Sequence, residues 1–138
     1  MEAKMPYKVL VIDDDPSFLE LMQTMLTAEG YEVATCGQSQ EALKAVDTFH
    51  PDVITLDLRM PPPSGWQLLE QLKSNPATRS IPVIVISAAG AELAETRERL
   101  QGYEGRDVSI LVKPFEIDEL LSQVANAVYH SNRGQLSA

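Results

Sequence analysis

Five short apolar runs alternate along the chain with longer segments of helical periodicity. The runs predict strands at 7–12, 31–35, 52–57, 82–87 and 108–112. All but the second are continuously hydrophobic, as is typical of parallel strands that are buried on both faces. Helices must therefore cover both sides of the sheet.

The segments between the strands predict five helices. Apolar residues at helical spacing mark the first helix at Phe18, Leu21, Met22 and Met25. The last helix has the clearest stripe, formed by Ile117, Leu120, Leu121, Val124 and Val128. Shorter amphipathic helices are expected at 39–49 and 65–74. The segment 91–100 has the fewest apolar positions, which makes that helix a candidate for movement.

This alternation of strand and helix, joined by short loops, is typical of the α/β class. It predicts a doubly wound five-stranded parallel sheet flanked by five helices. The 138 residues contain no internal repeat or linker. We therefore expect a single domain over 1–138, with a core at about 7–130 and frayed tails at both ends. Periodicity leaves the order of the strands open.

Composition excludes several classes of protein. Hydrophobic residues make up 44% of the chain, too many for a disordered protein, and no apolar run is long enough to span a membrane. The single cysteine excludes an internal disulfide and favours a cytoplasmic location. The formal charge of −9, without a dense cluster of lysine and arginine, disfavours direct binding to nucleic acid.

Chemically active residues follow four of the five predicted strands. The first strand runs into the triplet Asp13-Asp14-Asp15, and the third ends at Asp57. The fourth ends at Ser87, and the fifth is followed by Lys113-Pro114. Because the carboxyl ends of parallel strands lie on one edge of the sheet, these residues are expected to share one shallow cleft.

Each of these residues also has a purely structural interpretation. The acidic triplet could cap and charge the following helix, a role expected of Asp15. Asp57 lies in an apolar run, where a carboxylate needs a partner, and Lys113 could be that partner. Clustered carboxylates repel one another unless a cation joins them, and their oxygens suit Mg²⁺. A carboxylate between Mg²⁺ and a lysine is also a positioned nucleophile for phosphoryl transfer.

The ordered set Asp13-Asp14, Asp57, Ser87 and Lys113-Pro114 resembles the signature of receiver domains of two-component response regulators. The loop that starts Asp57-Leu58-Arg59-Met60-Pro61, with Gly65 after it, is also similar to the phosphorylation loop of that family. The resemblance covers about 7–130 and implies the strand order 2-1-3-4-5, as in flavodoxin.

The resemblance implies a stand-alone phosphorylation switch rather than an enzyme. Asp57 would accept a phosphoryl group from a histidine kinase or phosphotransfer protein. Mg²⁺ would be bound by Asp14, by Asp13 mainly through water, by Asp57 and by the backbone carbonyl of Arg59. Ser87 and Lys113 would contact the phosphoryl oxygens. Phosphorylation would change the surface offered to a separate downstream protein, with no direct contact to nucleic acid or membrane.

Two alternatives stay open at this stage. Ile110 stands where the family usually has an aromatic residue that rotates on activation, so the chain could be an interaction module that does not switch. The second alternative is a Mg²⁺-dependent phosphohydrolase with Asp57 or Asp13 as the nucleophile. The chain lacks a cap domain that would enclose a small substrate, which disfavours this alternative.

Overall fold

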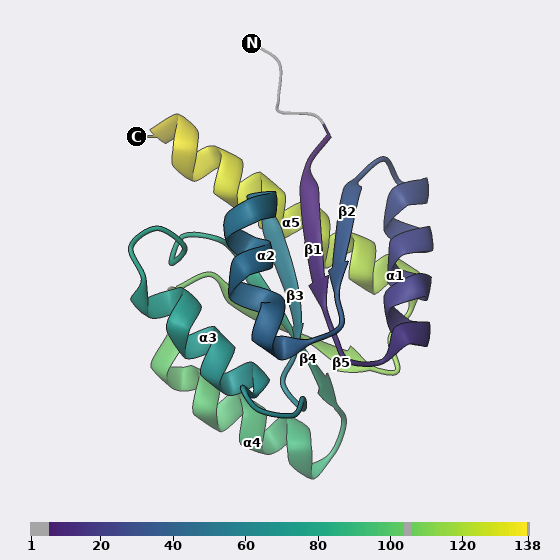
Figure 1. Ribbon diagram of the computed structural model, residues 1–138, viewed down its shortest axis with the longest axis vertical. Coiled ribbons are helices and arrows are strands. Elements are labelled where there is room, and N and C mark those ends of the chain that lie inside the picture. Colours follow the sequence, from purple (N-terminus) through teal and green to yellow (C-terminus); the bar gives the residue numbers. More distant parts are fainter. Residues whose placement is uncertain (1–5, 104–105, 138) are drawn as a thin grey trace.

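The computed structural model describes residues 6–103 and 106–137, and in this range it contains one five-stranded parallel sheet (Figure 1). The strand order is β2-β1-β3-β4-β5, which confirms the order that the resemblance implies. The strands are β1 (Lys8–Ile12), β2 (Glu32–Cys36), β3 (Val53–Asp57), β4 (Val83–Ala88) and β5 (Val108–Lys113). Every predicted strand is present, with ends that differ by one residue at most. The N-terminal tail predicted at 1–5 lies outside the described residues.

In the described part of the chain, five α-helices connect and follow the strands. They are α1 (Pro16–Ala28), α2 (Ala42–Phe49), α3 (Gly65–Ser74), α4 (Ala91–Leu100) and α5 (Ile117–Ser137). The helix predicted at 39–49 is divided into a 3-10 turn, Ser39–Glu41, and α2. A second 3-10 turn, Gln101–Tyr103, follows α4. The last helix continues to Ser137, although the sequence predicts a frayed tail from about 131.

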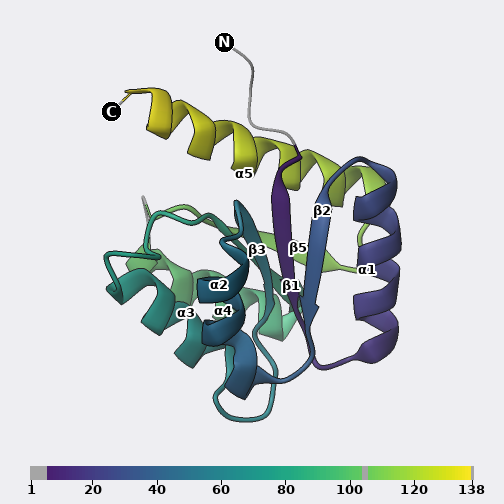
Figure 2. The ribbon, with the colours of Figure 1, turned by 45° about the horizontal axis from the view of Figure 1, so that its top comes forward.

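The sheet has one hydrophobic core on each face, as the continuous apolar strands require. Figure 2 shows α1 on one side of the sheet, with α2, α3 and α4 on the other. The first core contains residues of α2 and α3, among them Val46, Leu68, Leu69 and Leu72. The second contains residues of α1 and α5, among them Met22, Leu26, Leu120 and Val124. No helix of the described residues is long and apolar enough to cross a membrane.

The predicted helical stripes are only partly buried. Met22 and Leu26 of α1 are fully buried, but Leu21 is 52% exposed because it lies about 100° round the helix from Met22. Ile117, predicted to start the stripe of α5, is also exposed. The weak pattern of α4 is confirmed, since Thr96 is the one fully buried residue of that helix. Little apolar packing therefore holds α4 to the sheet.

Candidate functional site

The register of the sheet brings the four predicted strand ends together. Asp57, the last residue of β3, pairs with Ile86, which directly precedes Ser87. Lys113, the last residue of β5, pairs with Ala88. The expected meeting of these residues at one edge of the sheet is thus confirmed.

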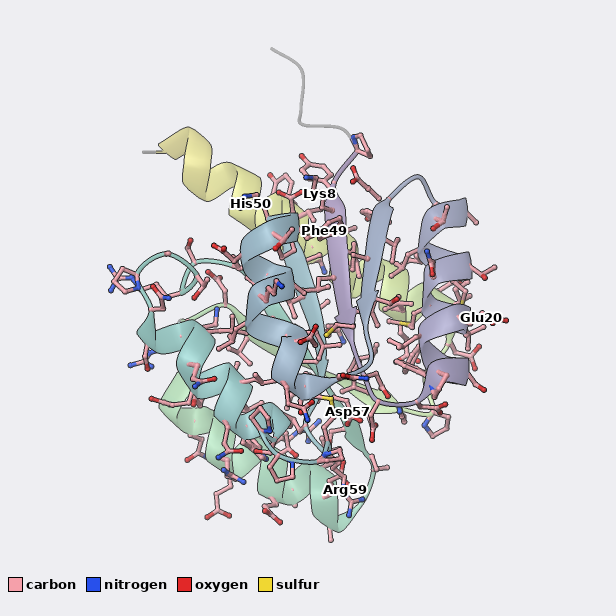
Figure 3. The ribbon with its side chains drawn as sticks, in the orientation of Figure 1. Lys8, Glu20, Phe49, His50, Asp57 and Arg59 are labelled. Atoms are coloured by element: carbon pink, nitrogen blue, oxygen red, sulfur yellow. The ribbon has the colours of Figure 1, made fainter. Side chains whose placement is uncertain are left out.

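Figure 3 locates this edge in the molecule. Asp57 and Arg59 lie at the lower end of the sheet, and Lys8, Phe49 and His50 lie at the opposite end. All strands run in the same direction, so the lower end carries their carboxyl termini (Figure 1). The candidate site therefore occupies the position at which open parallel sheets bind their ligands.

Three carboxylates meet at this edge. One oxygen each of Asp13, Asp14 and Asp57 lies within 4.8 Å of the other two. Asp13 is 1% exposed, Asp57 is partly buried and Asp14 is exposed. The backbone N–H of Asp15 donates to Asp13 Oδ1 at 2.9 Å, and that of Arg59 donates to Asp57 Oδ1 at 3.0 Å. These local hydrogen bonds restrain the side chains of Asp13 and Asp57.

The electrostatics of the cluster call for a cation. Asp13 Oδ2 is buried and has no hydrogen-bond partner among the described residues, which is costly for a carboxylate oxygen. Burial raises the pKa of Asp13. Burial, and to a lesser degree the charges of Asp13 and Asp14, raises the pKa of Asp57 to about 6. A divalent cation with oxygen ligands would remove both penalties, so the residues fit Mg²⁺.

The capping of α1, which begins next to the cluster, follows from the sequence. Asp15 is the N-cap of α1 and accepts from the N–H of Ser17 at 3.0 Å, with Pro16 in the first turn. The predicted capping role of Asp15 is confirmed. Asp15 is thereby used as a cap, which leaves Asp13 and Asp14 for the site.

Lys113 reaches the edge of the sheet but is not ion-paired there. Within the described part of the chain no ion pair joins it to a carboxylate. Its ammonium instead lies 4.4 Å from the centroid of the Phe18 ring. The charge of Lys113 still lowers the pKa of Asp57, against the larger effect of burial. The peptide bond between Lys113 and Pro114 is cis.

Ser87 belongs to a polar cluster that the sequence did not predict. Its hydroxyl is buried, donates to Ala88 O at 3.1 Å and lies 3.3 Å from Thr96 Oγ1. The backbone N–H of Ala88 donates to Glu92 Oε2 at 2.7 Å. Glu92 Oε1 forms an ion pair of 2.8 Å with Arg59 Nη1, without the alignment of a hydrogen bond. Arg59, although 76% exposed, is therefore not simply solvated.

Ile110 lies where an aliphatic side chain packs well. It is partly buried against the core that contains α3, and Leu100 and Tyr103 pack against the same core. Its backbone carbonyl accepts from Gln123 Nε2 of α5 at 2.8 Å. The position is thus filled by a packed side chain.

Magnesium should stabilise the fold through the buried carboxylates. We expect the free energy of unfolding to rise by about 1.4 to 2.7 kcal/mol when free Mg²⁺ is roughly 10 to 100 times its dissociation constant. Asp13→Asn should remove most of this increment, because it removes a ligand at the orphaned oxygen. Urea unfolding curves with Mg²⁺ and with EDTA measure this increase in the free energy of unfolding. Asp47→Asn, an exposed change of equal charge on α2, should keep the increment.

The sequence is similar to that of known proteins. The sequence model of the response regulator receiver domain matches residues 9–125. Response regulator PleD of Caulobacter vibrioides is 37% identical over 120 residues, which are 87% of this chain and 26% of that protein. The chain spans about half the length, or less, of the curated relatives that it matches.

Two solved receiver structures match over nearly all of their own length. The N-terminal domain of a response regulator receiver protein from Methanoculleus marisnigri JR1 has a TM-score of 0.70 and 33% identity, with 88% of this chain and 95% of that chain covered. Vibrio cholerae chemotaxis protein CheY4 has a TM-score of 0.77 and 26% identity, with 88% and 98% covered.

Proposed function

Since the chain belongs to the response regulator receiver domain family, a family of regulatory phosphoacceptors rather than catalysts, we propose that Asp57 accepts a phosphoryl group in the presence of Mg²⁺. The observation that carries the proposal is the cluster of Asp13, Asp14 and Asp57 within 4.8 Å at the carboxyl edge of the sheet. Receiver domains interact with histidine kinases. We propose a histidine kinase or a phosphotransfer protein as the donor.

The transfer needs a nucleophile and neutralisation of charge. An Asp57 carboxylate oxygen forms a bond to phosphorus while the bond from phosphorus to the donor's imidazole nitrogen breaks. The histidine leaves with that electron pair. Asp13, Asp14, Asp57 and the carbonyl of Arg59 would hold Mg²⁺, which when bound neutralises the charge on the transferred oxygens.

Ser87 and Lys113 would complete the contacts to the phosphoryl group. The Lys113 ammonium would leave the ring of Phe18 and pair with a phosphoryl oxygen, a stronger partner than an aromatic face. The Ser87 hydroxyl would turn from Ala88 O to the same group. Both movements follow the new charge on Asp57.

We further propose that phosphorylation changes the surface around α4 and is sensed by a separate protein partner. The single buried residue of α4, Thr96, lies against Ser87, so movement of Ser87 would loosen the helix. A cytoplasmic location and a single-domain architecture remain predictions.

The phosphoacceptor proposal is tested by intact mass after incubation with acetyl phosphate. With Mg²⁺ we expect one added phosphoryl group per chain, and with EDTA none. Free phosphate without an adduct would favour the phosphohydrolase instead. An unmodified protein with no phosphate released would overturn the proposal.

The switch is tested separately by amide hydrogen exchange. With Mg²⁺ and beryllium fluoride, which mimics a phosphoryl group on a carboxylate, we expect faster exchange in α4 because its polar contacts are lost. The last two turns of α1, beyond the contact of Lys113 with Phe18, serve as the internal reference. Unchanged exchange in α4 would favour an interaction module that does not switch, the alternative that Ile110 suggests.

A further inference from the structure

At the end of β4, a carboxylate of the chain itself is bound by hydrogen-bonding groups that could also bind another anion. Glu92, in the first turn of α4, accepts from the backbone N–H of Ala88 at 2.7 Å and contacts Ser87 Oγ at 3.4 Å. Arg59 adds an ion pair of 2.8 Å from the loop after β3. Glu92 is 23% exposed, so these contacts are partly shielded from water. Polar groups from two segments, the end of β4 and the loop after β3, therefore converge on one anion.

The same donors lie beside the proposed phosphoacceptor. Asp57 pairs with Ile86, so Ser87 and Ala88 follow it at the edge of the sheet. Ala88 in turn pairs with Lys113 on the far side. A phosphoryl group on Asp57 needs donors for its oxygens, and the Ala88 N–H already donates to an anion, with the Ser87 hydroxyl 3.4 Å from the same carboxylate.

Glu92 and a phosphoryl group cannot use these donors together. A backbone N–H has one proton to donate, and in this structure Ala88 donates it to Glu92. Two anions that shared these donors would also repel one another in a partly buried site. Binding of a phosphoryl group therefore requires that the Glu92 carboxylate leave.

We propose that Glu92 is an internal competitor of the phosphoryl group, which holds the donors at Ser87 and Ala88 in the unmodified protein and is expelled when Asp57 is modified. The proposal rests on the proposed function of Asp57. It assigns to Glu92 a positioning role: it restrains phosphorylation and ties the first turn of α4 to the site. Expulsion breaks the contacts of that turn with Ala88 and Arg59.

The test compares Glu92→Ala with the wild type on two readouts. The first is the initial rate of adduct formation with acetyl phosphate and Mg²⁺, in which the Asp57 oxygen bonds to phosphorus and acetate leaves. The second is the affinity for beryllium fluoride, followed by fluorine NMR. A lost hydrogen bond to a charged competitor should raise the affinity about tenfold, and the rate should also rise.

Two further variants separate competition from other effects. Glu92→Gln keeps an acceptor for Ala88 but removes the charge, so its increase should be smaller than that of Glu92→Ala. Glu95→Ala, an exposed change of equal charge on the same helix, should match the wild type. Unfolding curves establish that each variant is folded under the conditions of the assay.

The outcomes distinguish this proposal from the one on which it rests. A wild-type adduct together with an affinity at least twofold higher in Glu92→Ala supports the competitor. A wild-type adduct with an affinity less than twofold higher, or lower, overturns it and leaves the function of Asp57 intact. Absence of any adduct in both proteins overturns the proposed function itself.

Discussion

Asp57→Asn is expected to abolish the phosphoryl adduct while the protein stays folded. The neutral amide is a poor nucleophile, and it offers Mg²⁺ a weaker ligand than a carboxylate. The Arg59 N–H can still donate to the amide oxygen, so the local turn should persist. Intact mass after incubation with acetyl phosphate and Mg²⁺ measures the adduct.

The matched control for this prediction is Asp47→Asn, which removes the same charge from the exposed face of α2. It should take up one phosphoryl group like the wild type. An adduct that persists in Asp57→Asn would mean that another carboxylate, such as Asp13, is the acceptor. Loss of the adduct in both variants would point to a general effect of charge.

Gly65→Ala is expected to lower the free energy of unfolding by about 3 kcal/mol, at the upper end of the cost of overpacking. A Cβ at Gly65 would collide with the backbone oxygen of Asp57 and with Leu58 Cα. Neither atom belongs to a flexible side chain, so β3 and the start of α3 would have to separate. Urea unfolding followed by circular dichroism measures the change.

Gly102→Ala provides the control because nothing lies within 4 Å of the Cβ that it would add. Its free energy of unfolding should stay within about 1 kcal/mol of the wild type, with a small increase if the backbone is compatible. Equal stability of the two variants would contradict the steric explanation. Because the collision includes the Asp57 carbonyl, Gly65→Ala should also slow formation of the adduct.

The positions of Asp13, Asp57, Ser87 and Lys113 could be predicted from the sequence for a simple reason. Each follows a strong apolar run, and parallel strands deliver their carboxyl ends to one edge. The strand order could not be derived from periodicity, because any order would bury the same runs. It came from the resemblance to the receiver family and is confirmed by the pairing of the strands.

Glu92 was missed because its sequence context gives a sufficient explanation. An acidic residue in the first turn of a helix is expected to interact favourably with the helix dipole. Nothing in the neighbouring sequence suggests a further role for it. Its role depends on Ala88 and Arg59, which precede it by 4 and 33 positions and reach it from different segments. Periodicity carries no information on such contacts between side chains.

Lys113 was predicted correctly at the carboxyl end of the fifth strand, but its present contact was not predicted. The sequence allows an ion pair with Asp57, and the structure places the ammonium over Phe18 of α1. The choice between these partners depends on side-chain rotamers and on the charge state of the acidic cluster. Neither can be obtained from the order of residues along the chain.

The most direct test of the phosphoacceptor is to locate the phosphoryl group. Protein incubated with acetyl phosphate and Mg²⁺ is reduced with borohydride, which converts an aspartyl phosphate to homoserine, and its peptides are then sequenced by mass spectrometry. We expect homoserine in place of Asp57 alone, and none when Mg²⁺ is withheld. Homoserine at position 13 or 14 would contradict the proposed function. So would a result in which the intact protein carries the adduct but Asp57 is not converted to homoserine.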